Sequence, residues 1–428
     1  MSLILLLKHS MSSRWWEAID RRLNQDDIRS VCLLVLIIYS IVLAISFTTQ
    51  RSGRTVFGPQ LGADFAAYYV AGAIFNHVAP GRIYDRDLHR AIYQEVFPTA
   101  PSGEELPYVN APFFILPFIA LARLHYAWAY LCWLLISLGL FISGFNLIWK
   151  SLVGMPASAR HTALLLGLSF MPFLIECLAG GQTSAFGFFS FALAINCEYR
   201  GRKIMSGGAL ALCSYKPTLL LLALPMLVIT RRFSTIVGFL IGGLLLATTS
   251  SLIVGLQGCL GYLKMLLLFA DSSTSASSGL KSWKYVDVNS FFRPFLNQQA
   301  YLRWFFVALA FLVVLPLLFK FWRRRCRENE SNQDLVWAVT LTWTLVLNIY
   351  LGIYDTTLVV LSVLLTTHVL CRGVNNLHVE LKPDYKLTIL LLYLIPWITQ
   401  PIARLTGFQL YTVILALFGG YQLAQQRR

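Results

Sequence analysis

The sequence predicts an all-α, polytopic integral membrane protein, and two observations carry this prediction. Of its 428 residues, 57% are hydrophobic and only 13% are charged, whereas about 25% of the residues in soluble domains are charged. Apolar runs of the length that crosses a bilayer recur along the chain, with basic clusters between them. We therefore expect one membrane domain over residues 1–428.

About twelve transmembrane helices are expected from these runs. A helix needs roughly 20 residues to cross about 30 Å of hydrocarbon. The clear runs are 31–47, 126–148, 162–179, 184–197, 235–256, 301–322, 335–350, 356–371, 387–402 and 408–424. Two shorter runs, 204–214 and 218–229, flank Lys216-Pro217, and we expect them to be broken helices that go out and back. Residues 112–124 are expected to be re-entrant.

Charge predicts the orientation of the chain. The net charge of +15 is concentrated in clusters that can all face the cytoplasm, as the positive-inside rule requires. It does not indicate a nucleic-acid partner, because no basic stripe is interleaved with aromatic residues. Residues 1–30 are then an uncleaved cytoplasmic arm, and both termini lie inside. We expect a multi-pass protein of a cell membrane of the bacterial inner-membrane type, with its site on the non-cytoplasmic face.

Two large loops, residues 48–110 and 257–300, are expected outside the membrane. The first should hold two short amphipathic helices, 64–76 and 87–97, lying in the interface plane. The polar stretch 271–279 of the second could open and close over a site. The eight cysteines form no close-spaced pair, which argues against a disulfide framework or a zinc site. Neither a calcium loop nor an HExxH motif is present, so we expect no metal and no other cofactor.

Asp64 stands at the head of an apolar, tyrosine-rich segment just after the first apolar run. It can be the N-cap of the helix 64–76 or a general base that removes a proton from a hydroxyl group, and both can hold at once. Tyr68 lies four residues later and so shares a helix face with Asp64. We expect Asp64 to be catalytic and Tyr68 to contact the substrate.

Other polar residues are expected to converge on the same outer face. Lys216 is expected to bind phosphate, because an outward lysine runs against the positive-inside bias; the alternative is a lysine that snorkels to lipid head groups. Arg293 can clamp a phosphate with two hydrogen bonds or anchor the chain at the interface. Gln182 lies in a turn, and its amide can donate to and accept from sugar hydroxyls. Asn289 is a further substrate-binding candidate, and Asp355 either caps the next helix or positions a substrate.

Several short motifs occur in the order and spacing of a known family. They are Asp64-Phe65 with Tyr68-Tyr69 and Ala71-Gly72, Pro80 with Tyr84-Asp85, Gly181-Gln182, residues 207–217 ending in Tyr215-Lys216-Pro217, and Tyr354-Asp355-Thr356-Thr357-Leu358. In these motifs the chain resembles glycosyltransferase family 87, the polyprenol-phosphate-mannose-dependent mannosyltransferases of the GT-C membrane fold. Two departures stand out: Ala111-Pro112 keeps one proline where the family often has two, and the last two apolar runs carry no family element.

The resemblance implies an inverting glycosyltransferase, a hexosyltransferase that moves a sugar, mannose, from a polyprenyl-phosphate donor to a hydroxyl of a lipid or glycan acceptor. Asp64 would deprotonate the acceptor, and Lys216 with Arg293 would hold the phosphate leaving group.

A transporter or flippase of lipid-linked sugars is the alternative. It should place ionisable residues near the midplane, often with paired repeats. A non-catalytic assembly factor with a decayed site is a third possibility. Charges at the ends of the runs and the intact motifs favour the enzyme.

Overall fold

The computed structural model describes residues 24–425 apart from 52, 102, 104, 275–281, 297, 328–332 and 373–380. Over this part of the chain the fold is built from helices, and extended pairing is limited to isolated bridges such as Tyr285 with Gly352. The all-α prediction is confirmed. Nearly all of the N-terminal arm lies outside the described residues, as do residues 275–279 of the polar stretch 271–279.

The described helices follow one another along the chain and are joined by short connections. In order they are α3 (Gln25–Thr49), α4 (Phe65–His77), η1 (Pro80–Arg82), α5 (Arg86–Val96), η2 (Pro112–Ile115), α6 (Leu116–Leu121), α7 (Tyr126–Ser151), α8 (Ala157–Leu168), η3 (Pro172–Ala179), α9 (Ser184–Tyr199), α10 (Lys203–Leu212), η4 (Cys213–Tyr215), η5 (Pro217–Leu220), α11 (Ala223–Ile229), α12 (Phe233–Thr274), η6 (Ser282–Lys284), α13 (Val288–Phe292), α14 (Ala300–Arg327), α15 (Gln333–Val346), η8 (Ile353–Leu358), α16 (Val359–Arg372), α17 (Pro383–Thr406) and α18 (Leu410–Ala424).

Among the described residues, six helical segments are long and apolar enough to cross a membrane. They are α3, α7, α14, α17, the segment Phe233–Leu268 of α12 and the segment Ile353–Arg372. The pair α8 and η3, bent by 52°, can form a seventh. Three more apolar helices, Pro112–Leu121, Pro217–Ile229 and Leu410–Ala424, are shorter. These lengths indicate a polytopic membrane protein, while twelve crossings stay a prediction.

The helical backbone is interrupted at Lys216, where the sequence predicts a break. The chain leaves α10 through η4, which ends at Tyr215, and resumes helical structure in η5 at Pro217. Proline has no N–H to continue a helix and disfavours helical geometry in the residue before it. Lys216 is accordingly extended, with φ −139° and ψ 86°. The break leaves this lysine between two short helical arms.

A second break divides α12 at Gly255. The apolar segment Phe233–Leu268 has 36 residues, far more than the roughly 20 that span the hydrocarbon layer. Gly255 adopts φ 67° and ψ 178°, which glycine reaches at little cost, and the chain kinks there. Helical structure thus continues to Thr274, beyond the end expected at residue 256. We call residues 256–268 the α12 arm.

The two helices expected in the first outer loop differ from each other in their surroundings. α5 is amphipathic, with only His89 and Tyr93 buried. α4 is buried along ten consecutive residues from Phe65 to Ile74. The prediction of an amphipathic helix at residues 64–76 is therefore wrong. A helix that is apolar on every side belongs in a core, and α4 packs against α5 and α6.

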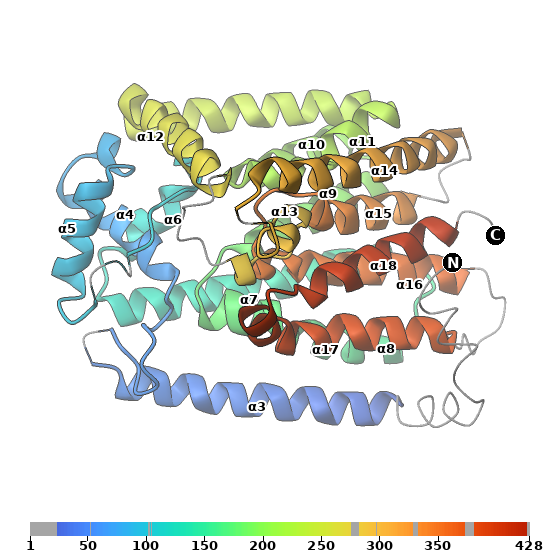
Figure 1. The fold of residues 1–428 in the computed structure, drawn as a ribbon, viewed down its shortest axis with the longest axis horizontal. Coiled ribbons are helices and arrows are strands. Elements are labelled where there is room, and N and C mark those ends of the chain that lie inside the picture. Colours follow the sequence, from blue (N-terminus) through green and yellow to red (C-terminus); the bar gives the residue numbers. More distant parts are fainter. Residues whose placement is uncertain are drawn as a thin grey trace.

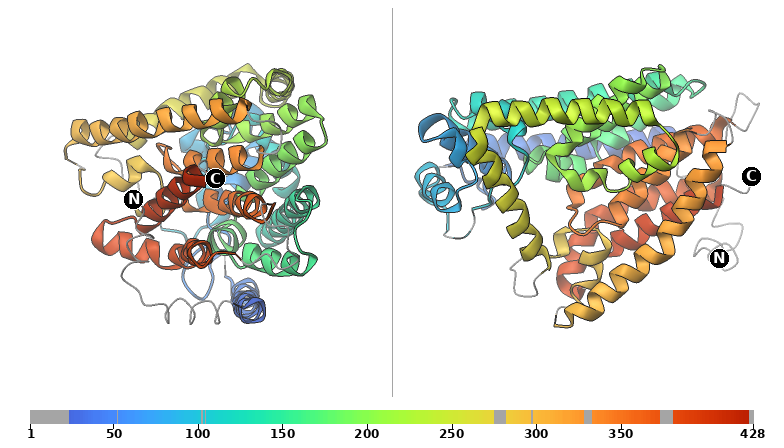
Figure 2. Two further views of the ribbon diagram at one scale, coloured as in Figure 1. Left: turned by 90° about the vertical axis from the view of Figure 1, so that its right-hand side faces the viewer. Right: turned by 90° about the horizontal axis from the view of Figure 1, so that it is seen from above.

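The helices form a layered bundle whose two ends differ (Figure 1). α3 begins and α18 ends at one end of the bundle, while α4, α5, α6 and the kink of α12 lie at the other. The view from above in Figure 2 shows the α12 arm turning away from the first part of the same helix. The helices of the predicted outer loop 48–110 therefore lie at the end of the bundle opposite to the start of α3 and the end of α18.

Two glycines bring α10 and α12 into close contact. A Cβ atom on Gly207 would lie 1.9 Å from the Thr235 carbonyl oxygen, and one on Gly238 would lie 2.0 Å from the Ile204 carbonyl oxygen. Small residues at an interface allow the backbones of two membrane helices to come into direct contact. The backbone contact thus explains why residue 207, which lies in one of the family-like motifs, is glycine.

We expect Gly207→Ala and Gly238→Ala each to destabilise the protein by about 3 kcal/mol, because overpacked methyl groups force backbones apart. Gly243→Ala is the matched control, since a Cβ atom there meets nothing within 4 Å. Thermal unfolding in detergent measures the difference. Equal melting temperatures for all three variants would contradict the close helix contact.

Candidate functional site

Asp64 directs its carboxylate at a turn between η3 and α9. The side chain makes no capping hydrogen bond to α4, although the residue occupies the N-cap position. Instead Oδ2 accepts a hydrogen bond from Gln182 Nε2 at 2.5 Å, and the Asp64 N–H donates to the Gly180 carbonyl at 2.9 Å. The helix-cap interpretation is therefore wrong. The carboxylate is held by a residue 118 positions away in the sequence.

Gly181 allows this turn to lie against the start of α4. Its φ is +75°, and a Cβ atom would come within 2.5 Å of the Phe65 Cβ atom. Trp133 Nε1 donates to the Gly181 carbonyl at 3.1 Å. The turn follows η3, which is a π-helix, a rare form that is frequent at functional sites. Only glycine fits this position, both in its backbone conformation and in its packing.

Gln182 connects Asp64 to Tyr68. The Tyr68 hydroxyl donates to Gln182 Oε1 at 3.3 Å, while the Gln182 NH₂ group donates to Asp64. This pattern fixes the orientation of the amide, because its oxygen and nitrogen each have a defined partner. Tyr68 and Gln182 are both buried. The structure thus brings three of the predicted site residues together.

The surroundings of Asp64 act on its pKa in opposite directions. Burial raises the pKa of Asp64 above the ordinary range of aspartate, whereas the positive charge of Lys284 and the hydrogen bond from Gln182 lower it. Burial is the largest of these effects because it disfavours the charged carboxylate. A carboxyl group of this kind is a stronger base, once ionised, than an exposed one.

Lys216 is paired with a carboxylate in the structure. Its Nζ atom forms an ion pair with Asp355 Oδ2 and donates to the Tyr354 hydroxyl at 3.3 Å. The Lys216 side chain is 17% exposed and that of Asp355 is 1% exposed. Lys216 is therefore held inside the protein and does not extend to lipid head groups.

Asp355 does not serve as a cap for the helix that follows it. It lies inside η8, and its Oδ2 atom is occupied by Lys216. Its Oδ1 atom is buried and has no hydrogen-bond partner among the described residues. The helix-cap interpretation of Asp355 is thus wrong, and one oxygen remains available as an acceptor.

The Asp64 group and the Lys216 group adjoin through the residues that follow Gln182. The Tyr215 hydroxyl donates to the Thr183 carbonyl at 3.2 Å, and Thr357 Oγ1 donates to Ser184 Oγ at 3.3 Å. Tyr215 precedes Lys216, and Thr357 lies two residues after Asp355. The turn that orients Asp64 therefore also contacts both segments that carry the ion pair.

Asn289 and Arg293 belong to a neighbouring cluster around α13. Asn289 Nδ2 donates to the Ile349 carbonyl at 2.9 Å, and the Asn289 Oδ1 atom is buried with no hydrogen-bond partner among the described residues. Arg293 is 5% exposed. Burial lowers its pKa, and the nearby Tyr350, Asp287 and Tyr285 raise it. These two residues thus pack against the loop before η8.

Tyr285 and Tyr350 lie within electrostatic reach of both Asp64 and Asp287. Their hydroxyl groups form a hydrogen bond with each other. Burial raises the pKa of both, and the charges of Asp64 and Asp287 raise it further. Asp287 accepts hydrogen bonds of 2.9 Å from the backbone N–H groups of Ser290 and Leu351, and burial raises its pKa to about 6. The α13 cluster is therefore within electrostatic reach of Asp64.

Three charged residues at or beside this site are absent from the sequence prediction. The positive charge of Lys284 lowers the pKa of the Asp64 carboxyl. Glu176 accepts from Gln400 Nε2 at 2.7 Å and lies within electrostatic reach of Lys284 and Asp64. A carboxylate inside the apolar run 162–179 is itself a functional signal. Asp287 is the third. No group of three potential metal ligands occurs among the described residues.

Comparison with known proteins gives one match. The family model of glycosyltransferase family 87 matches residues 108–348, more than half of the chain. The matched segment includes Gln182, Lys216, Lys284 and Arg293, while Asp64 precedes it. No curated protein and no solved structure matches the chain.

Proposed function

The chain belongs to glycosyltransferase family 87, and from this premise we propose that it moves a sugar, mannose, from a polyprenyl-phosphate donor to a hydroxyl group of a lipid or glycan acceptor. We place the reaction on the outer face of the membrane. The end of the bundle that holds α4, α5 and α6 supports this side, since α3 begins and α18 ends at the opposite end.

The observation that carries the proposal is the Asp64 carboxylate fixed by Gln182. The amide occupies Oδ2, so Oδ1 is the oxygen to which an acceptor hydroxyl would donate. The hydroxyl proton passes to Asp64 while the acceptor oxygen forms a bond to the anomeric carbon. The bond from that carbon to the phosphate oxygen breaks, and its electron pair leaves with the polyprenyl phosphate. One base and one displacement invert the anomeric configuration.

The leaving phosphate requires positive charge, because fixed cations stabilise charge that develops in the transition state. We assign this role to Lys216 and Arg293, with Lys284 as a third cation. Lys284 supports the assignment because it lies close enough to Asp64 for its charge to lower the pKa of that carboxyl. Lys216 carries Asp355 as a counter-charge, so it would reach a phosphate while keeping that ion pair.

Binding of a sugar requires hydrogen-bond acceptors and donors for its hydroxyl groups. The unpaired oxygens Asp355 Oδ1 and Asn289 Oδ1 are buried, and a buried polar atom without a partner is rare in folded proteins. We propose that both accept from substrate hydroxyls. Tyr68 and Gln182 complete this surface on the side of Asp64.

The experiment that tests this function supplies purified protein with a labelled polyprenyl-phosphate sugar and candidate acceptors. We expect a glycosylated acceptor, and free monosaccharide from slow hydrolysis when no acceptor is present. A nucleotide sugar is the control donor and should yield no product. Transfer from the nucleotide sugar, or no turnover of the lipid donor with any acceptor, would contradict the proposal.

The pH dependence of transfer should reflect the raised pKa of Asp64. Because only the ionised carboxylate accepts a proton, kcat/KM should fall as the pH drops below that pKa, at a pH above the ordinary aspartate value of about 3.9. Lys284→Met removes a charge that lowers this pKa. The fall of kcat/KM on the acidic side of the pH profile, its acid limb, should therefore move to higher pH. Lys284→Arg should keep the limb in place, as should Lys203→Met at an exposed site. If the acid limb of Lys284→Met stays at the wild-type pH, Lys284 does not act on the pKa of Asp64.

A further inference from the structure

A cleft of about 640 Å³ lies between the first outer loop and the α12 arm. Its walls are η1 with the start of α5 on one side and residues 256–268 on the other. The two walls meet at glycines: a Cβ atom on Gly258 would lie 3.4 Å from the Gly81 Cα atom. Lys216, Arg293 and Asp64 do not line this cleft. It is therefore separate from the proposed reaction site.

The cleft carries an excess of positive charge. Arg82, Arg86 and Lys264 line it together with a single carboxylate, Asp85. Asp85 is paired with Arg82, with Nη2 and Oδ2 2.6 Å apart. Arg86 and Lys264 are exposed and have no ion-pair partner among the described residues. Two cations thus remain uncompensated.

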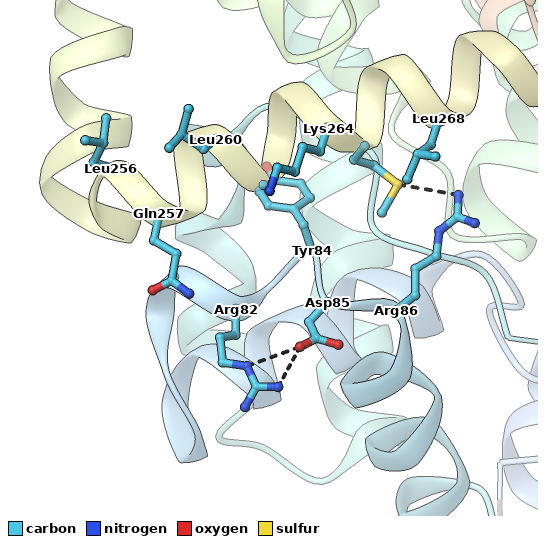
Figure 3. Close-up of a pocket in the computed structure, with 12 residues that line it drawn as sticks. Arg82, Tyr84, Asp85, Arg86, Leu256, Gln257, Leu260, Lys264 and Leu268 are labelled. Atoms are coloured by element: carbon cyan, nitrogen blue, oxygen red, sulfur yellow. Dashed lines mark hydrogen bonds and ion pairs between the residues drawn. The ribbon is translucent and has the colours of Figure 1, made fainter.

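The two cations extend into the cleft from opposite walls (Figure 3). Arg86 extends from the loop to the α12 arm, where its Nη2 atom is 3.9 Å from Met265 Sδ. Lys264 points from the α12 arm toward the loop, beside the Tyr84 ring. An anion in the cleft would be attracted by a cation on each wall.

The α12 arm also presents an apolar surface next to these cations. Leu256 is 74% exposed, Leu260 is 50% exposed and Leu268 is 52% exposed. Figure 3 shows Leu256 and Leu260 pointing away from the loop, on the side opposite to Gln257 and Lys264. Leu268 lies four residues after Lys264 and so borders the cation on the helix surface. A helix with exposed leucines beside its cations lies stably at a membrane interface, with the leucines in the acyl layer.

We propose that this cleft binds the phosphate head group of an anionic membrane lipid, whose hydrocarbon chains lie along Leu256, Leu260 and Leu268. The two uncompensated cations select a head group with a net negative charge over a zwitterionic one, since each Lys or Arg near the surface attracts anionic lipid. The exposed leucines select a lipid over a soluble phosphate. The lipid would hold the α12 arm against η1 at the level of the head groups. This inference does not depend on the proposed reaction.

Native mass spectrometry of the detergent-solubilised protein tests the proposal. Phosphatidylglycerol is the anionic probe, phosphatidylcholine with the same chains is the zwitterionic probe, and glycerol phosphate is the head group without chains. We expect the wild-type protein to bind phosphatidylglycerol in preference to the other two. Arg86→Gln/Lys264→Gln should weaken that binding roughly 30-fold.

The control variant is Arg123→Gln/Lys203→Gln, which removes the same charge from exposed positions outside the cleft. It should bind phosphatidylglycerol as the wild type does. All four side chains are exposed, so both variants should melt at the wild-type temperature. Equal binding of the two lipids, an equal loss in both variants, or displacement of the lipid by an equal concentration of glycerol phosphate would overturn the proposal.

Discussion

Asp64→Asn is expected to fold like the wild-type protein and to lose sugar transfer by a factor of about 10²–10⁴, the contribution of a placed general base. The amide still accepts a hydrogen bond from Gln182, so the turn keeps its partner. It cannot take a proton from the acceptor. Because burial already disfavours the ionised carboxylate, replacement by a neutral amide should not lower the melting temperature.

Initial rates of transfer from a labelled lipid donor measure this loss, and Glu95→Gln is the matched control. Glu95 is an exposed carboxylate on α5, in the same loop, and its substitution should leave the rate unchanged. Transfer by Asp64→Asn at the wild-type rate would remove Asp64 from the mechanism.

Lys216→Met is expected to destabilise the protein by about 3–5 kcal/mol, because it leaves the buried Asp355 carboxylate without its partner. The double variant Lys216→Met/Asp355→Asn should recover most of that stability, since neither charge is then buried alone. Lys203→Met at an exposed position should have no effect. Thermal unfolding of the wild type, the single variants Lys216→Met and Asp355→Asn, and the double variant gives the coupling free energy between the two residues.

The same double variant separates structure from donor binding. If Lys216 holds the donor phosphate, the stable double variant should show a raised KM for the lipid donor. A stable double variant with a wild-type KM would assign Lys216 to folding alone. Additive losses of stability in the two single variants would contradict the ion pair itself.

Local sequence signals predict much of the helical structure correctly. The break at Lys216-Pro217 follows from proline chemistry, and the helix at residues 86–96 follows from its apolar period. The continuation of α12 to Thr274 does not follow from a local signal. Polar residues after Gly255 end the apolar run, whereas the helix continues beyond it. The burial of α4 also escapes prediction, since it depends on α5 and α6 packing over it.

The pairing of site residues depends on contacts that no local pattern contains. Asp64 and Gln182 are 118 residues apart, and Lys216 and Asp355 are 139 residues apart. The sequence predicts that all four residues lie on one face of the membrane, through topology and resemblance. It cannot show that Lys216 is neutralised by Asp355, or that Lys284 acts on Asp64. Both facts follow only from the folded arrangement.

The anomeric configuration of the transferred sugar tests the central claim most directly. With an α- or β-linked lipid donor of known configuration, the one-bond carbon–hydrogen coupling at the anomeric centre of the product reports the outcome. A single base at Asp64 predicts inversion. Retention would exclude a single in-line displacement, because it requires another route such as a covalent bond between a carboxylate and the sugar, and it would contradict Asp64 as a general base.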